Sequence, residues 1–495
     1  MLRKECRLGD YRISQSGEKV TIEKLDQRLK LLNVARGEML VSPDTARVVV
    51  LEKVGNGSYT NVYCVNSGGL DRLWSVSDPN MWCEVVDFSN TLLILKERSY
   101  TACRVVVSDL CSGRVIYQSG VTHPLNITGI LAEAERSFLL LKASSCFVEL
   151  IKYSAGADQA LLRFKLTART DIAGFKRLFL YGDRLFVSAY RWTGNVILRF
   201  DLSRARVDLL CPALGDSAKI IIKRGRLEVA FENLINRSCG RGSYRLRPIT
   251  QATMINGVPV VLYRHRRSFA RKLILTSYGC YGKVTELAFD PMLSLLYRLG
   301  CDVAVAYPRG GGELGDKWHL AGSGRNKKIT IRDINAVVRG LRNDSGSKCK
   351  IVALSESAGA SVVLLSELLN QGGCLFDGLL LSHPVISIAS VVRARGRYSS
   401  FEKDEWEEFL RLNSLSCFEA LRGSRSRRLP PLLVFATRHD PLAPFHDVDT
   451  FISTYRNRGG HALLNVESST LHGGFKTVRF QIMMVLKICS WLRSI

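Results

Sequence analysis

The chain has 495 residues, of which 46% are hydrophobic, and a formal net charge of +25. This length exceeds one ordinary core, so two domains are expected, and the apolar content excludes a disordered chain. The 14 cysteines form no CxxC pair and no Cys/His cluster with zinc-ligand spacing, which argues against a zinc site and favours reduced thiols in the cytoplasm.

The amino terminus and the basic clusters narrow the functional classes further. The first 15 residues contain no apolar core of a secretory signal. The most apolar segment, 480–495, is interrupted by Lys487 and Arg493 and is shorter than the ~20 residues of a membrane span. The basic clusters at 264–272 and 422–428 have no aromatic platform beside them and are interpreted as solvated loops. We therefore expect neither a membrane nor a nucleic acid as the main partner.

Residues 38–244 have the pattern of an all-β domain, preceded by an extension at 1–37. Short alternating or β-branched runs, such as ARVVVLEKV at 46–54 and RLFVSAY at 184–190, are separated by turn sequences such as VGNGS at 54–58. This pattern predicts stacked antiparallel sheets in a sandwich or a propeller. At about 40–45 residues per blade, the segment would hold roughly five blades, and we expect a reduced β-propeller.

Residues 245–495 alternate between buried strands and amphipathic helices, which predicts a mostly parallel sheet with helices on both faces. The predicted strands are 272–277, 302–307, 350–354, 378–382, 432–436 and 462–466. The predicted helices are 292–298, 331–342, 358–370, 446–456 and 477–493. In such sheets the chemistry lies beyond the carboxyl ends of the strands, so the residues that follow each strand are the candidates.

The sequence SESAG at 355–359 follows the third predicted strand and opens a helix. It is close to the G-x-S-x-G nucleophile elbow, in which a sharp turn exposes the serine. Ser355 takes the place of the first glycine, and Ser357 would be the nucleophile. The alternative is a serine-rich turn with no chemistry.

A serine hydroxyl needs a base to take its proton, and the base needs a carboxylate behind it. Asp440 follows the strand 432–436, and His472 lies between the last predicted strand and the last predicted helix. Ser357, Asp440 and His472 therefore occur in the order Ser, acid, His of an α/β hydrolase. Asp440 is taken as the acid because it lies nearest the strand end, and three neighbours are rejected: His439, Asp447 and Asp449.

Acyl transfer also needs donors for the developing oxyanion. The backbone N–H of Ala358 follows from the elbow geometry. The second donor is expected after the first predicted strand, where YGCYG occupies 278–282 and Tyr278 carries a hydroxyl. The alternative for Tyr278 is an aromatic ring packed beneath a glycine turn.

Together these residues resemble the prolyl oligopeptidase family of serine peptidases, nearest to its oligopeptidase B branch. The most specific similarity is RGGGELGDKWH at 309–319, which resembles the family's RGGGExGxxWH signature. Four further motifs are similar to family motifs in the same order: YGCYG at 278–282, KKITIRD at 327–333, HD at 439–440 and HGG at 472–474. The resemblance is strong from about residue 272 to residue 495.

The resemblance implies an α/β-hydrolase domain capped by a propeller, so that only short peptides reach the site. It implies cleavage after basic residues through an acyl-enzyme, with no metal or organic cofactor. The specificity acids of the branch would be Glu402 and Asp404, since FEKDEW at 401–406 takes the place of the family's acidic segment. Carboxylates at these positions would bind an Arg or Lys side chain of the substrate. The alternative is a solvated, charged helix face.

Three departures from the family keep other functions open. Fewer residues precede the hydrolase domain, Leu442 stands where the family has an arginine that holds the substrate backbone, and the charge of +25 repels cationic peptides. The alternatives are an esterase or acylaminoacyl-type hydrolase on the same fold, and a degenerate, non-catalytic binding scaffold. The presence of Ser357, Asp440 and His472 argues against the scaffold.

Overall fold

The computed structural model describes the chain outside a series of short gaps. The gaps are residues 1–3, 9–10, 17–18, 25–31, 35–36, 42–46, 55–56, 67–68, 79–81, 89–90, 99–101, 111, 124–125, 132–136, 145–146, 155–159, 167–171, 205, 224–225, 237–247, 266–271, 346–348, 372, 390–404, 407–415, 425–427, 469–471 and 473–476. The chain forms two compact units. Unit 1 comprises Met1–Thr170 and Tyr398–Phe401, and unit 2 comprises Asp171–Arg397 and Glu402–Ile495.

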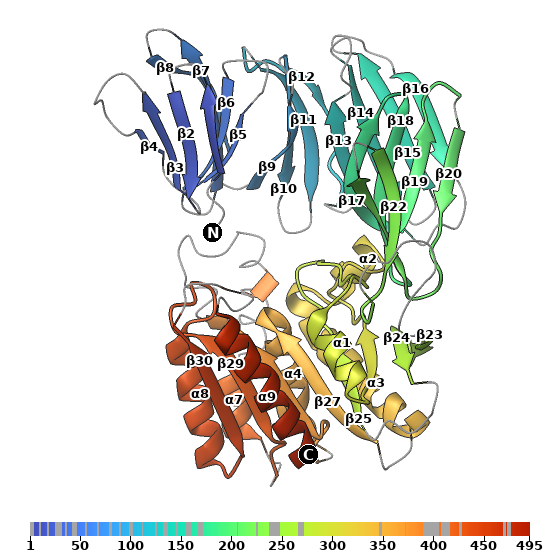
Figure 1. Cartoon of the computed structure of the whole chain (residues 1–495), viewed down its shortest axis with the longest axis vertical. Helices are drawn as coiled ribbons and strands as arrows, with labels where there is room; N and C mark the ends of the chain where they lie inside the picture. The colour runs from blue at the N-terminus through green and yellow to red at the C-terminus, as the bar shows by residue number, and fades with distance from the viewer. Residues whose placement is uncertain are drawn as a thin grey trace. The chain divides into compact units, whose positions relative to one another are not determined.

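Unit 1 contains four-stranded antiparallel sheets in which consecutive strands are neighbours (Figure 1). Their strands are β1 (Lys4–Leu8), β2 (Tyr11–Ser16), β3 (Lys19–Lys24), β4 (Leu32–Val34), β5 (Gly37–Val41), β6 (Arg47–Val54), β7 (Gly57–Asn66), β8 (Gly69–Asp78), β9 (Trp82–Phe88), β10 (Leu92–Arg98), β11 (Cys103–Asp109), β12 (Val115–Gln118), β13 (Ile127–Leu131), β14 (Ser137–Ser144), β15 (Phe147–Ser154) and β16 (Ala160–Leu166). Four-stranded meanders are the units from which propeller blades are made. The all-β character predicted for this region is confirmed, and its first sheet, β1–β4, lies within residues 1–37.

The period-two pattern of the strands explains how these sheets pack. Leu92 and Ile94 of β10 and Val105 of β11 are fully buried, and they form one apolar cluster with Phe138 and Leu140 of β14. Because alternate residues of a strand face the same side, each of these strands presents one apolar face to the neighbouring sheet. Burial between sheets, rather than pairing within one sheet, therefore holds this part of unit 1 together.

Unit 2 begins with a further four-stranded antiparallel sheet and a two-stranded ribbon. The strands are β17 (Ile172–Tyr181), β18 (Arg184–Arg191), β19 (Val196–Asp201), β20 (Arg206–Leu210), β21 (Ser217–Lys223) and β22 (Arg226–Glu232). Hydrogen bonds tie this region to the α/β part of the same unit: Tyr263 donates its hydroxyl to the carbonyl of Gly215 at 2.6 Å, and Asn195 donates to Glu286 at 3.0 Å. The domain boundary near residue 245 stays a prediction.

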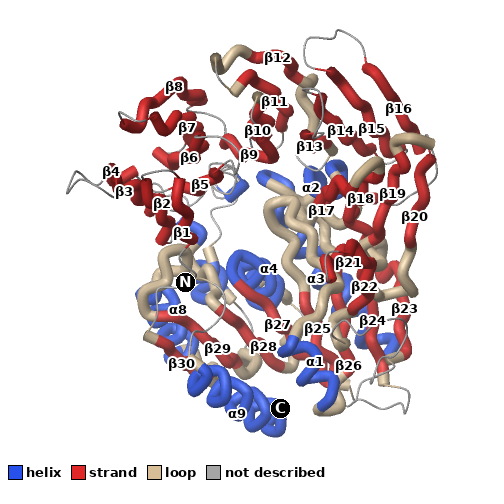
Figure 2. Tube along the Cα trace, turned by 45° about the horizontal axis from the view of Figure 1, so that its top comes forward, coloured by secondary structure: helices blue, strands red, loops and turns tan. Residues whose placement is uncertain are grey.

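The centre of unit 2 is an eight-stranded mixed sheet with the order β23-β24-β26-β25-β27-β28-β29-β30 (Figure 2). The strands are β23 (Ile249–Ile255), β24 (Val258–Arg264), β25 (Lys272–Thr276), β26 (Asp302–Ala306), β27 (Lys350–Glu356), β28 (Gly378–Ser382), β29 (Leu432–Thr437) and β30 (Ala462–Glu467). Strands β23, β24 and β26 pair antiparallel, and the pairs from β26 to β30 are parallel. The predicted parallel sheet is confirmed, and its carboxyl-terminal edge gathers the loops that follow β25, β27, β28, β29 and β30.

Sequence reasoning did not foresee the hairpin β23–β24, although its signal is present. Asn256 and Gly257 form the two-residue turn, with φ angles of 49° and 82°. Positive φ at both central residues is what a type I′ turn requires, and Asn-Gly is its preferred sequence. The flanking strands extend the sheet beyond the parallel core on the β26 side.

Helices cover both faces of the sheet. They are α1 (Pro291–Arg298), α2 (Asp316–Ala321), α3 (Lys327–Ser345), α4 (Ser357–Leu368), α7 (Cys417–Gly423), α8 (Phe445–Asn457) and α9 (Val478–Ser494), with a 3₁₀ turn at Gly324–Asn326. Leu296 of α1 and Trp491 of α9 share one core cluster with alternate strand residues such as Val352 and Leu433. Helix α4 packs on β27 and β28, with α3 and α7 beside it, on the opposite face (Figure 1).

Within the described part of the chain, no helix combines the length and the apolar character that crossing a bilayer requires.

Candidate active site

The turn between β27 and α4 places Ser357 in a left-handed conformation, with φ of 51°. Such a conformation is unfavourable for a residue with a side chain and is found where the surroundings enforce it. Gly359 shows why small residues are needed here: a Cβ atom on it would lie 2.8 Å from Ser355 Oγ and 3.2 Å from the carbonyl oxygen of Ser277. Ser355, in place of the usual glycine, is buried and donates its hydroxyl to Ser277 at 3.2 Å.

The side chain of Ser357 is the first of three in a hydrogen-bonded row. Its Oγ lies 2.8 Å from Nε2 of His472, and Nδ1 of His472 lies 2.9 Å from each carboxylate oxygen of Asp440. The backbone N–H groups of Leu442 and Ala443 donate to Asp440 Oδ1 at 2.8 and 2.9 Å. Asp440 is therefore buried, fixed by its own loop and directed at the imidazole. The carboxylate selects the tautomer with the proton on Nδ1, which leaves Nε2 free to accept the serine proton.

The three alternatives rejected on the sequence lie elsewhere. His439 is exposed beside Asp440, and Asp447 and Asp449 belong to α8. Leu442 brings a half-buried apolar side chain to the loop of Asp440.

His383 is a residue of this site that sequence reasoning missed. It follows β28, is buried, and its ring lies 5.9 Å from the ring of His472 in an edge-on arrangement. Its Nδ1 lies 2.9 Å from the hydroxyl of Ser382, and its φ is 45°. The signal was available, because a histidine directly after a parallel strand stands at the same sheet edge as Ser357.

The YGCYG loop (residues 278–282) borders the elbow. A Cβ atom on Gly359 would lie 3.1 Å from Cδ2 of Tyr278, so the ring of Tyr278 lies against the start of α4. The ammonium of Lys283 lies 4.9 Å from the centre of the same ring. The N–H of Ala358 belongs to the first turn of α4, where helix N–H groups have no partner within the helix. Tyr278 and Ala358 thus flank Ser357 from two elements.

The residues of the RGGGELGDKWH motif support this loop rather than contact Ser357. Arg309 donates through its side chain and its backbone N–H to Asp333 of α3, at 2.9 Å in both cases. Thr330 donates to the carbonyl of Arg309 at 2.7 Å. The N–H of Gly282 donates to the carbonyl of Gly310 at 3.0 Å, which joins the motif to the YGCYG loop.

Glu313 of the same motif is completely enclosed. It accepts the N–H of Thr285 at 2.9 Å, and burial raises the pKa of its carboxyl group to about 7. A carboxyl group in this position is a buried hydrogen-bond partner for the segment after the YGCYG loop.

The predicted specificity acids, Glu402 and Asp404, lie outside the described residues. The adjoining Glu405 and Trp406 are described and are fully buried. Within the described ranges, His, Cys, Asp and Glu side chains form no group of three or more placed to hold a metal ion.

A cavity of about 540 Å³ borders the same edge of the sheet. Tyr278, Glu356 and Ser382 line it at the strand ends, and Phe435 and Met484 are among its apolar walls. Apolar space therefore lies next to the residues that flank Ser357.

Comparison with known proteins identifies this part of the chain. Residues 287–495 match the model of the prolyl oligopeptidase family. Protease 2 of Moraxella lacunata is 26% identical over 192 residues, which are 37% of this chain and 27% of that protein. The prolyl endopeptidase-like protein of Rattus norvegicus is 30% identical over 184 residues, 36% of this chain and 25% of that protein. These matches span less than a third of the length of the relatives.

Solved structures resemble the chain over a larger share of its length. Oligopeptidase B from Trypanosoma brucei, with covalently bound antipain in a closed form, has a TM-score of 0.72 at 17% identity and covers 93% of this chain and 73% of that chain. At this identity the similarity establishes the fold. The family model covers Ser357, Asp440 and His472 but begins after the YGCYG loop. The resemblance predicted from the motifs is confirmed: residues 287–495 of this chain match the model of the prolyl oligopeptidase family.

Proposed function

We propose that the protein is a serine peptidase that cleaves short peptides through an acyl-enzyme. The observation that carries the proposal is the row Ser357–His472–Asp440, with 2.8 Å between Oγ and Nε2 and 2.9 Å between Nδ1 and the carboxylate. Hydrogen-bond contact between nucleophile and base, and between base and carboxylate, is the geometry that activates a serine.

The reaction proceeds in two halves. Ser357 Oγ attacks the peptide carbonyl carbon while His472 Nε2 takes the hydroxyl proton, and the negative charge develops on the carbonyl oxygen. His472 then gives that proton to the leaving amine as the C–N bond breaks, which leaves an ester on Ser357. A water molecule attacks the ester carbonyl, its proton passes to Nε2, and the ester C–O bond breaks as the proton returns to Oγ.

Two donors are proposed for the oxyanion: the N–H of Ala358 and the hydroxyl of Tyr278. Their support is the elbow conformation of Ser357 and the contact of the Tyr278 ring with the start of α4. A donor of this kind contributes about 10²–10³ to the rate, because it acts on charge that exists only in the transition state.

For substrate, we propose short peptides with Arg or Lys before the cleaved bond, bound by Glu402 and Asp404. The support is the acidic sequence at 402–408 in a chain with net charge +25, and the relatives named Protease 2 and oligopeptidase B. A carboxylate pair favours arginine, whose planar guanidinium bonds two oxygens at once. A cytoplasmic location is part of the same proposal, and its support is the expectation that the cysteines of the chain are reduced thiols.

Covalent labelling tests the nucleophile. We expect a fluorophosphonate probe to label the wild-type chain and to lose all labelling in Ser357→Ala. Ser366→Ala is the matched control, because Ser366 lies on the same helix, is buried, and donates to the carbonyl of Val362 at 2.8 Å. Labelling that persists in Ser357→Ala, or that is lost equally in Ser366→Ala, contradicts the proposal.

An esterase or acylaminoacyl-type hydrolase on the same site is the second candidate. Leu442 in place of a backbone-holding arginine and the apolar cavity of about 540 Å³ favour it. A fluorogenic panel with Arg, Lys, Pro and Ala before the cleaved bond, together with acylated amino acids and short esters, separates the two. Preference for Arg that survives Glu402→Gln with Asp404→Asn rejects the proposed acids.

A further inference from the structure

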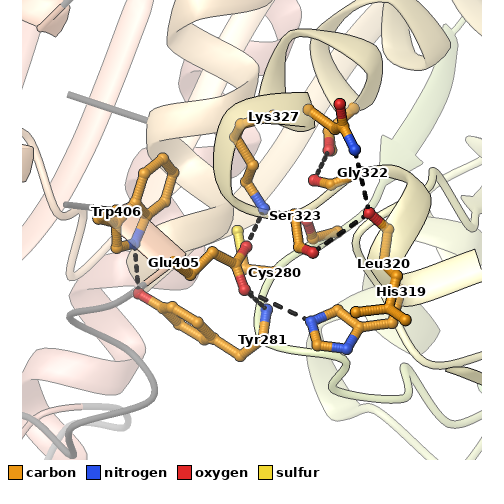
Figure 3. A network of polar contacts seen from close by, with 12 residues as sticks. Cys280, Tyr281, His319, Leu320, Gly322, Ser323, Lys327, Glu405 and Trp406 are labelled. Carbon is orange, nitrogen blue, oxygen red and sulfur yellow. Dashed lines mark hydrogen bonds and ion pairs between the residues drawn. The ribbon is translucent and has the colours of Figure 1, made fainter. Parts of the chain in front are cut away.

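A buried ion pair lies behind the YGCYG loop and takes no part in the proposed proton transfers. Lys327, at the start of α3, and Glu405 have completely buried side chains, and the ammonium donates to Glu405 Oε1 (Figure 3). The same ammonium donates to the carbonyl of Gly279 at 2.7 Å and lies 5.1 Å from the centre of the Trp406 ring. Lys327 thus holds the carbonyl of the residue that directly follows Tyr278.

The partner carboxylate holds the other half of the loop. Glu405 Oε2 accepts the backbone N–H of Tyr281 at 2.8 Å, and Trp406 Nε1 donates to the hydroxyl of Tyr281 at 2.6 Å (Figure 3). Tyr281 has a φ of 62°, which a bulky residue adopts only when its surroundings enforce it. Glu405 and Trp406 supply that constraint from a segment 124 residues away in sequence.

His319 closes the network on the side of the family signature. Its Nε2 lies 3.6 Å from Glu405 Oε2, and a Cβ atom on Gly282 would lie 2.8 Å from its Nδ1. Gly282, with φ of 61°, therefore ends the loop in contact with the ring of His319. The loop is held at Gly279, Tyr281 and Gly282 by side chains from three different segments.

We propose that the Lys327–Glu405 pair is a positioning device that fixes the YGCYG loop, and with it Tyr278, against Glu405 and Trp406. The inference rests on the proposed function, in which the hydroxyl of Tyr278 meets the oxyanion. The proposed role of Tyr278 then depends on this ion pair, since Lys327 contacts the residue after Tyr278.

A purely stabilising role does not account for this arrangement. A buried ion pair contributes little beyond what apolar residues of the same volume would contribute, because both charges lose their hydration. What distinguishes this ion pair from apolar side chains is that each charged group also forms a directional hydrogen bond with one backbone group of the loop. The pair therefore controls where the loop lies.

The test is the double variant Lys327→Met with Glu405→Gln. It leaves no unpaired buried charge, and the glutamine oxygen still accepts the N–H of Tyr281. We expect kcat for an Arg substrate, and the rate of fluorophosphonate labelling, to fall about 10- to 100-fold, because small displacements of reacting or stabilising groups cost this much.

A second, partly exposed ion pair at the opposite edge of the sheet provides a control. Arg342 donates to Asp377 at 2.9 Å and to the carbonyl of Leu375 at 2.8 Å, and Asp377 accepts the N–H of Ile351 at 2.9 Å. This pair has the same bonding pattern but lies at the start of β27, whereas Ser357 follows its end. Arg342→Met with Asp377→Asn should leave kcat and the labelling rate within about twofold of wild type.

The outcomes separate the inference from the proposed function. Absence of Ser357-dependent labelling in the wild type would refute the proposed function itself. If the wild type reacts and the variant Lys327→Met with Glu405→Gln has the same kcat, the inference alone is overturned. It is also overturned if the Arg342–Asp377 control variant loses as much kcat as the Lys327–Glu405 variant. If the double variant does not fold, Trp406→Phe replaces it. This change removes the bond to Tyr281 and keeps an aromatic ring beside Lys327, and an unchanged kcat there also overturns the inference.

Discussion

Gly359→Ala tests how closely the elbow and Tyr278 are packed. The added Cβ would lie 2.8 Å from Ser355 Oγ, 3.1 Å from Tyr278 Cδ2 and 3.2 Å from the Ser277 carbonyl oxygen. The hydroxyl of Ser355 can rotate away only by losing its bond to Ser277, which is worth about 1 kcal/mol. The ring of Tyr278 must also move, and overpacking of this kind costs about 1–3 kcal/mol.

The expected result is a variant destabilised by about 1–3 kcal/mol, with kcat reduced at least about tenfold, because Tyr278 shifts relative to the oxyanion. Ser355→Gly removes the nearest obstacle and recreates the glycine usual at that position. In the double variant we expect part of the loss to be recovered, so that the two changes are non-additive by about 1 kcal/mol. The contacts with Tyr278 and Ser277 remain, and full recovery is not expected.

The assay is a double-mutant cycle measured by urea unfolding and by the rate of fluorophosphonate labelling. Additive losses in the cycle would mean that Ser355 does not limit the space at Gly359. Wild-type kcat in Gly359→Ala would mean that Tyr278 is free to move without consequence, and would refute the packing argument for the elbow.

Three further predictions concern the substrate and the buried acid. Leu442→Arg should lower KM for peptides by about 10- to 100-fold and leave KM for short esters unchanged, because a charge-assisted bond to the substrate backbone is worth about 1.5–3 kcal/mol. Equal peptide KM values for the wild type and Leu442→Arg would contradict this prediction. Because of the net charge of +25, kcat/KM for Arg peptides should rise with salt more than kcat/KM for neutral peptides does. Salt shortens the range of the repulsion, to a Debye length of ~8 Å at physiological ionic strength. The same salt dependence for both substrates would refute the repulsion. Burial raises the pKa of Glu313 from 4.5 to about 7, so the folded protein binds a proton at Glu313 more tightly than the unfolded chain does. The free energy of unfolding of the wild type therefore falls as pH rises through this range. Relative to wild type, Glu313→Gln should therefore gain up to about 3 kcal/mol between pH 5 and pH 8 in urea unfolding, and a pH-independent difference would contradict the assignment.

The residues nearest to the proposed chemistry were accessible from the sequence because each follows a strand. Ser357, Asp440 and His472 lie after β27, β29 and β30, and a parallel sheet brings these strand ends to one edge. The order of the residues and the type of fold were therefore enough to predict that they meet. His383 obeys the same rule after β28, and it was missed because no motif drew attention to it.

The supporting contacts were not accessible in this way. Glu405 stands in the most acidic stretch of the chain, where the pattern favours exposed charge, yet its side chain is fully buried against Lys327. The two residues are 78 positions apart and come from segments that no periodicity relates. Which of several neighbouring acids points inward depends on the path of the backbone, and a charge pattern carries no information on that path.

The same distinction explains why a signature motif can be so specific and yet contain none of the proposed reacting groups. Arg309 is bonded to Asp333, and His319 lies against Gly282 and Glu405, so residues of the motif make contacts with the YGCYG loop or with the helix that supports it. Each of these contacts requires one side-chain geometry: a forked guanidinium, a flat imidazole, or a glycine with no Cβ. Three reacting residues can be placed by many sheets of this type, but holding a strained tyrosine loop beside them requires this particular set. The motif is therefore best understood as the support of the YGCYG loop, and substitutions in it should change kcat through the position of Tyr278 while Ser357, His472 and Asp440 keep their contacts.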